Sequence, residues 1–89
     1  MRTITFEILG KELRQFVIDN FLFGRDEPFS NQDSLIENGL IDSTGVLELI
    51  AFLEEKYEIK IAQAEMIPDN LDSIQRLSNF VCRKLGVPA

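Results

Sequence analysis

A chain of 89 residues, 45% of them apolar, is expected to form one small domain spanning residues 1–89, with little interior space for an enclosed active site. It contains no His and a single Cys, so the commonest general base and metal ligand are missing, disulfide frameworks and multi-cysteine zinc sites are excluded, and we do not expect an enzyme. The 15 acidic residues outnumber the 9 basic ones, which argues against nucleic acid and anionic membranes and favours partners with basic patches.

The apolar residues are too dispersed for a membrane segment. The longest unbroken apolar run extends from Leu49 to Leu53, whereas a membrane span needs about 20 residues. No basic segment leads into an apolar stretch with a cleavage site, as it does in a signal peptide. We therefore expect a cytoplasmic monomer with a reduced thiol.

The first predicted element is an amphipathic helix from about Thr5 to Phe23, followed by Gly24 as a stop signal. Its apolar residues recur at steps of three and four: Ile8, Leu9, Leu13, Phe16, Val17 and Phe21. From Arg25 to Ile41 no helical period is visible, and turn-forming residues are frequent. The apolar residues of this long loop predict that it packs onto the helices: Phe29, Leu35, Ile36, Leu40 and Ile41.

The helical period returns from Ser43 to Tyr57, with Asp42 in the N-cap position. The expected buried stripe of this helix is Val46, Leu49, Ile50, Leu53 and Tyr57. A short or irregular helical turn is predicted over Met66–Asn70. A last helix begins after Asp72 or Ser73, buries Ile74, Leu77, Val81 and Leu85, and ends at Gly86 and Pro88. The prediction is an all-α bundle of four helices with a long first loop and a short third helix.

Three Asp-Ser pairs raise the question of whether one serine has a chemical role: Asp33-Ser34, Asp42-Ser43 and Asp72-Ser73. Any of them is explained by helix capping alone. Gly39 ends a helix after Ser34 within about one turn, and the helix after Ser73 is basic, so both serines are interpreted as structural. Ser43 differs because it begins a strong helix, where unpaired N–H groups and the helix dipole favour a phosphate.

The helix that starts at Ser43 is acidic on one side. With its flanking residues it carries five acids and one base, a local charge of −4. Leu47 and Ala51 lie off the buried stripe, beside Glu48 and Glu55. This apolar strip with acidic borders indicates a docking surface for basic proteins, and an ordinary solvated helix face remains the alternative.

The stretch GLIDSTGVLELIAFLEEKYEIKI, Gly39 to Ile61, resembles the acyl carrier protein family, and a looser likeness covers nearly the whole chain. The resemblance implies a stand-alone carrier in which Ser43 bears 4′-phosphopantetheine, transferred from coenzyme A by a phosphopantetheinyl transferase. The thiol of this group would hold an acyl chain as a thioester. Asp42 would cap the helix and help the transferase to engage.

The resemblance also assigns a face to the partner enzymes, which would be a loading ligase, a ketosynthase or an acyltransferase. The implied docking residues are Thr44, Leu47, Glu48, Ala51 and Glu55. The positions implied to line a core that shelters the acyl chain are Val46, Ile50, Leu53 and Tyr57. An aminoacyl or peptidyl carrier differs in cargo only and stays open, as does an unmodified helical module that binds a basic partner.

The chain departs from the family directly after the serine, where Leu or Met is usual and Thr44-Gly45 is found. A polar β-branched Thr44 should change which enzymes dock well. We expect Gly45 to cost up to about 1 kcal/mol of helix preference and to open space beside Ser43. These two residues favour a specialised fatty-acid or polyketide-like pathway over the housekeeping synthase.

Two further features are predicted to be structural. Cys82 follows Val81 on the last helix and is expected to be buried, without a His to activate it. The oxygen-bearing side chains from Asn31 to Glu37 do not match a calcium loop, because Leu35 and Ile36 occupy positions that need an oxygen ligand and a glycine.

Overall fold

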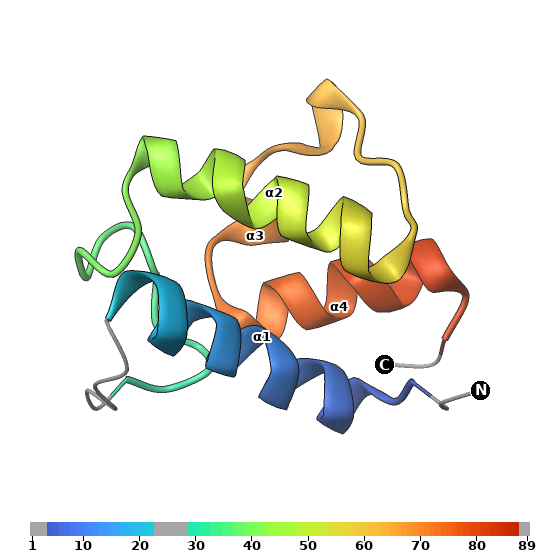
Figure 1. Ribbon diagram of the computed structural model, residues 1–89, viewed down its shortest axis with the longest axis horizontal. Coiled ribbons are helices and arrows are strands. Elements are labelled where there is room, and N and C mark those ends of the chain that lie inside the picture. The colour runs from blue at the N-terminus through green and yellow to red at the C-terminus, as the bar shows by residue number, and fades with distance from the viewer. Residues whose placement is uncertain (1–3, 23–28, 88–89) are drawn as a thin grey trace.

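The computed structural model describes residues 4–22 and 29–87 (Figure 1). Within these ranges all regular structure is helical, which confirms the all-α prediction. The elements are α1 (Phe6–Phe21), α2 (Ser43–Tyr57), a 3₁₀ turn η1 (Gln63–Glu65), α3 (Pro68–Leu71) and α4 (Ile74–Leu85). In Figure 1, α1 runs antiparallel to both α2 and α4. None of the described helices is long and apolar enough to cross a membrane.

Helix α1 begins where the sequence predicts and ends slightly earlier. Thr5 is its N-cap, and the Thr5 hydroxyl accepts a hydrogen bond from the Ile8 N–H at 3.2 Å. The helix ends at Phe21, and the predicted end at Phe23 and the stop signal Gly24 lie outside the described residues. The helix packs against α4, and its buried residues are Leu9, Leu13, Val17 and Ile18.

Aromatic rings connect α1 to α2. Phe16 stacks on Phe52 with 4.0 Å between ring centroids and an interplanar angle of 19°. Farther along α2, the Tyr57 hydroxyl donates a hydrogen bond to the Glu12 carboxylate at 2.8 Å. Phe16 is only partly buried and covers the side of the bundle between the two helices. The buried core consists mainly of aliphatic side chains, with Phe80 as its largest fully buried member.

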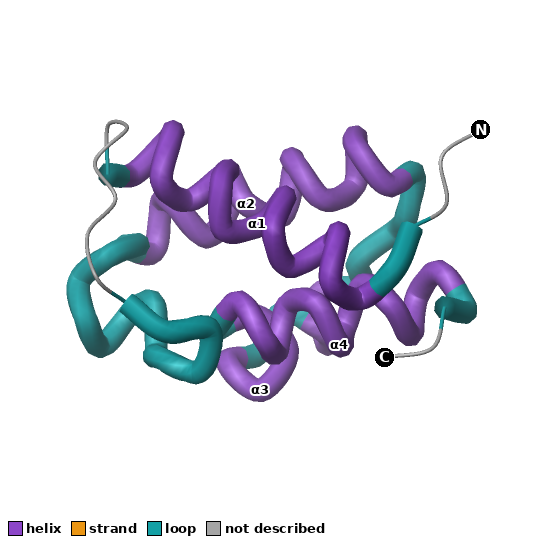
Figure 2. Tube along the Cα trace, turned by 90° about the horizontal axis from the view of Figure 1, so that it is seen from below, coloured by secondary structure: helices purple, strands orange, loops and turns teal. Residues whose placement is uncertain are grey.

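The loop before α2 packs onto the helices, as its apolar residues predict. Leu35 and Ile41 are buried in the core, whereas Ile36 is 48% exposed. The Arg14 guanidinium of α1 donates to the Phe29 carbonyl at 2.7 Å and the Asn31 side chain at 3.1 Å, and lies 3.9 Å from the centre of the Phe29 ring. Figure 2 shows the loop beside α3 and the start of α4. The part of the predicted loop from Arg25 to Pro28 lies outside the described residues.

Helix α4 is capped by Ser73, whose hydroxyl accepts from the Arg76 N–H at 3.0 Å. Asp72, the other candidate, binds the loop instead. The helix ends at Gly86, which adopts a left-handed φ of 73°, and the second predicted terminator, Pro88, lies outside the described residues. Leu85 is only partly buried, although the sequence placed it in the buried stripe.

Candidate functional site

Ser43 is the first residue of α2, and its neighbours hold it at the surface. Asp42 is the N-cap, as predicted, and its Oδ1 accepts from the Gly45 N–H at 2.7 Å. Ile41, directly before the cap, is buried at 3% exposure and anchors the entry to the helix. Ser43 itself is exposed. The cap satisfies one helix N–H, and the rest of the first turn favours a negative group attached at this end.

Gly45 does not open space beside Ser43, so that expectation is wrong. The residue is buried, and a Cβ atom placed on it would lie 2.8 Å from Cε1 of Phe21 and 2.9 Å from Cγ2 of Ile41. Those side chains already fill the volume. Glycine at this position allows the start of α2 to approach the end of α1 more closely than any other residue would permit.

The serines of the other two Asp-Ser pairs have structural roles. The Ser34 hydroxyl donates to the Asp72 carboxylate and accepts from the Glu37 N–H at 3.0 Å. The turn after Ser34 ends at Gly39, with φ 72°. Ser73 is 3% exposed and caps α4. Ser43 differs from both, because it is exposed to solvent at the start of α2.

The predicted docking residues share the exposed face of α2. Leu47 is 65% exposed, unusually high for a large apolar side chain. The other four are exposed as well: Thr44, Glu48, Ala51 and Glu55. Glu54 lies on the same side of α2 but is half-buried, and its carboxylate is engaged within the fold because its Oε2 accepts from the Ile61 N–H at 3.0 Å. The acidic border of the strip around Leu47 therefore consists of Glu48 and Glu55.

An apolar cavity of about 140 Å³ lies against the first turns of α2. Its lining residues are Leu35, Ile36, Ile41, Val46, Leu49, Met66, Ile67, Pro68, Leu71 and Asp72. We refer to it as the α2–α3 pocket. Three apolar residues that line it are substantially exposed, which shows that the pocket opens to solvent: Ile36, Met66 and Ile67.

The four residues predicted to line the core are divided between the α2–α3 pocket and the closed core. Val46 lines the pocket and is accordingly only partly buried. Ile50, Leu53 and Tyr57 belong to the closed core and are not among the lining residues. Met66 and Ile67 line the pocket although nothing in their helical spacing predicts it; the only local sign is that this apolar pair directly precedes Pro68.

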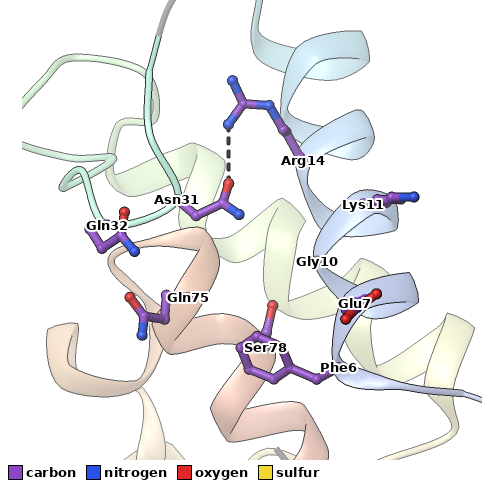
Figure 3. Close-up of a pocket in the computed structure, with 9 residues that line it drawn as sticks. All are labelled: Phe6, Glu7, Gly10, Lys11, Arg14, Asn31, Gln32, Gln75 and Ser78. Atoms are coloured by element: carbon purple, nitrogen blue, oxygen red, sulfur yellow. Dashed lines mark hydrogen bonds between the residues drawn. The ribbon is translucent and has the colours of Figure 1, made fainter.

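A second cavity, of about 350 Å³, lies between α1, the loop and α4 (Figure 3). Its walls carry mainly polar side chains, with Gln32 and Gln75 on one side and Lys11 and Glu7 on α1. None of its lining residues comes from α2. It is therefore separate from the surface around Ser43.

The described residues contain no group of three or more His, Cys, Asp or Glu side chains placed to hold a metal. The segment from Asn31 to Glu37, which does not match a calcium loop in sequence, follows an ordinary turn in which the Asp33 carboxylate accepts a hydrogen bond from the Ser30 N–H at 2.8 Å. Cys82 is fully buried, as predicted, and burial raises the pKa of its thiol.

The fold and the site together define a small all-α bundle that presents a serine at the start of an acidic helix, beside an apolar pocket. No protein-family model matches the chain. Over 81 residues the chain is 26% identical to a probable acyl carrier protein, PigG, of Serratia sp. (strain ATCC 39006). The similarity covers 91% of this chain and 93% of that protein.

Proposed function

We propose that the protein is an acyl carrier protein that bears 4′-phosphopantetheine on Ser43 and delivers thioester-bound acyl groups to partner enzymes. The single observation that carries this proposal is the exposed Ser43 at the capped start of α2. Similarity to a probable acyl carrier protein over most of the chain supports it. Acyl carrier proteins are not enzymes, which agrees with the absence of His from the sequence.

The residues around Ser43 fit an attached phosphodiester. In the attachment step, the Ser43 Oγ forms a bond to the phosphorus nearer the pantetheine, the bond from that phosphorus to the bridging oxygen of the pyrophosphate breaks, and adenosine 3′,5′-bisphosphate leaves. The hydroxyl proton passes to a base of the transferase, and the Asp42 carboxylate, which accepts from the Gly45 N–H, holds the start of the helix in place. Once attached, the prosthetic group supplies a thiol that holds the acyl chain as a thioester.

The exposed face of α2 fits partners with a basic rim around an apolar centre. Leu47 provides an apolar contact, and the exposed carboxylates of Glu48 and Glu55 beside it attract Lys or Arg of the partner. We assign this surface to the phosphopantetheinyl transferase and to a loading ligase, ketosynthase or acyltransferase. Thr44 lies exposed in the first turn, and its hydroxyl supports service to a specialised fatty-acid or polyketide-like pathway.

The α2–α3 pocket is proposed to shelter the acyl chain. Val46 lies one helical turn after Ser43 and Ile41 two residues before it, and both line the pocket. A chain attached through Ser43 therefore reaches an apolar surface next to its point of attachment. Burial of acyl carbons there stabilises the loaded form, because each buried methylene group contributes about 0.8 kcal/mol.

The test is to incubate the protein with coenzyme A and a broad-specificity phosphopantetheinyl transferase and to measure the intact mass. We expect a gain of one phosphopantetheine group in the native protein and in Ser34→Ala, which keeps the other Asp-Ser pairs. Ser43→Ala should show no gain. No gain of mass in the native protein, or a gain that persists in Ser43→Ala, would refute the assignment of Ser43 as the attachment site.

A cellular experiment separates the carrier from an unmodified interaction module with the same acidic face. Ser43→Ala and Glu48→Lys are compared for their ability to replace the native protein. A carrier loses function in both variants, since it needs the arm and the docking face. If Ser43→Ala keeps full function while Glu48→Lys loses it, the protein acts as an unmodified module.

A further inference from the structure

The volume of the α2–α3 pocket depends on how closely two segments far apart in the sequence are held together. One wall belongs to α2, through Val46 and Leu49. The second wall is the loop, with Leu35, Ile36 and Ile41, and the third runs from Met66 to Asp72. The loop and the third wall form the side of the pocket that faces α2, so movement of one relative to the other changes the space available.

Asp72 holds these two walls together. Its Oδ1 accepts from the Ile36 N–H at 2.9 Å, its Oδ2 accepts from the Ser34 hydroxyl, and its backbone carbonyl accepts from the Leu35 N–H at 3.1 Å. Three consecutive loop residues are thus bound to one residue at the end of α3. Two of these bonds are made to the carboxylate and are therefore of the stronger, charge-assisted kind.

The position of Asp72 within the pocket is also unusual. It is the one ionisable residue in a lining that is otherwise apolar, and it is buried, at 9% exposure. A buried carboxylate is costly unless hydrogen-bond donors surround it, and here the loop supplies those donors. Separation of the loop from Asp72 would leave the carboxylate and the loop N–H groups unpaired. The clamp therefore resists expansion of the pocket.

We propose that Asp72 is a specificity-determining residue that clamps loop residues 34–36 onto α3 and thereby limits the pocket to short acyl cargo. The inference rests on the proposed function for the identity of the occupant. The pocket measures about 140 Å³, and an apolar cavity of about 150 Å³ accommodates one benzene molecule. The cargo that fits is an apolar group of about six carbon atoms, either a short chain or one small ring.

The larger cavity between α1 and α4 does not provide an alternative site for longer acyl chains. None of its lining residues comes from α2, so a chain attached at Ser43 does not meet it, and its lining includes the charged side chains of Glu7, Lys11 and Arg14. An acyl chain longer than the α2–α3 pocket therefore has to leave its distal carbons in water or break the clamp.

The first arm of the test uses the unmodified full-length protein and a series of straight-chain alcohols from butanol to decanol. Binding is followed by the NMR shifts of the Val46, Leu49 and Leu71 methyl groups. For the native protein, the affinity should rise about fourfold per added carbon up to hexanol and then stop rising. In Asp72→Ala, which removes both carboxylate contacts, the rise should continue through octanol.

Three further variants separate a specificity role from a merely structural one. Ser34→Ala removes one hydrogen bond to the Asp72 carboxylate, so the affinity should keep rising beyond hexanol, but over fewer carbons than in Asp72→Ala. This variant provides a readout if Asp72→Ala fails to fold. Asp72→Asn keeps an acceptor for the Ile36 N–H and gains an NH2 group that can donate to the Ser34 hydroxyl oxygen, so it should keep the limit at hexanol. Asp69→Ala, an exposed acid of α3 outside the pocket lining, should behave as the native protein does.

Two results would overturn the inference: a native affinity that keeps rising fourfold per carbon through decanol, or a limit at hexanol that persists in both Asp72→Ala and Ser34→Ala. The second arm attaches acyl-phosphopantetheine of the same chain lengths to Ser43 and measures the protection of the thioester from hydroxylamine. Protection should stop increasing at six carbons. Failure of attachment refutes the proposed function alone, because the alcohol series still decides whether Asp72 limits the pocket.

Discussion

Replacement of Gly45 by Ala adds one methyl group where the start of α2 meets the end of α1. The new Cβ would lie 2.8 Å from Cε1 of Phe21, 2.9 Å from Cγ2 of Ile41 and 3.3 Å from Oδ1 of Asp42. Distances below 3.0 Å require a neighbour to move. Ile41 has little freedom to do so, because it is buried and its Cγ2 atom is attached directly to Cβ.

Two opposing terms set the expected loss of stability. Overpacking of a well-filled site costs about 1–3 kcal/mol. The higher helix preference of Ala offsets up to about 1 kcal/mol, and less in the first turn of a helix. The net expectation is a destabilisation of about 1–2 kcal/mol, which lowers the melting temperature of a domain this size by roughly 4–16 °C.

The measurement is urea unfolding at equilibrium, with Gly10→Ala as the matched control. A Cβ atom on Gly10 would meet Ser78 Oγ at 3.6 Å, an ordinary contact, so this substitution should stabilise α1 by about 0.5–1 kcal/mol. The two Gly→Ala variants are thus expected to change the free energy of unfolding in opposite directions. Equal stabilisation by both would refute the tight packing of Gly45 against Phe21 and Ile41.

Two further predictions concern titrating groups. Cys82 is buried, and burial raises the pKa of its thiol, so a thiol reagent should find no reactive group in the folded unmodified protein. It should find one after phosphopantetheine is attached to Ser43, and two after that modified protein is denatured. Rapid labelling of Cys82 in the folded protein would contradict this prediction. Hydrogen bonds from Lys84 and from the Ala62 N–H lower the pKa of Glu65 below its usual 4.5. The ionised Glu65 carboxylate therefore contributes its full stabilisation above pH 4.5, and this stabilisation is lost as the pH falls through the lowered pKa. The difference in unfolding free energy between the native protein and Glu65→Gln should accordingly disappear in acid. A difference that is independent of pH would show that the carboxylate charge of Glu65 makes no contribution.

The helices and the position of Ser43 follow from local features of the sequence. Apolar residues at steps of three and four predict α1, α2 and α4, and the structure confirms them within a few residues. Asp42 is recognisable as a cap because capping involves residues only three apart. The exposure of Leu47 is equally local, since its place on the helix follows from the helical period.

The tertiary structure decided the features that depend on contacts between distant residues. Ser34 and Asp72 are 38 residues apart, so no periodic pattern pairs them, and the clamp on the pocket was not foreseen. Gly45 was expected to create space, but Phe21 of α1 fills that space from 24 positions earlier in the chain. Glu54 of α2 binds the Ile61 N–H, seven positions later and beyond the end of the helix, which the helical period does not indicate. Sequence periodicity specifies which face of a helix is buried; the residues that meet that face, and the cavity left between them, are set by how the helices and the loop pack together.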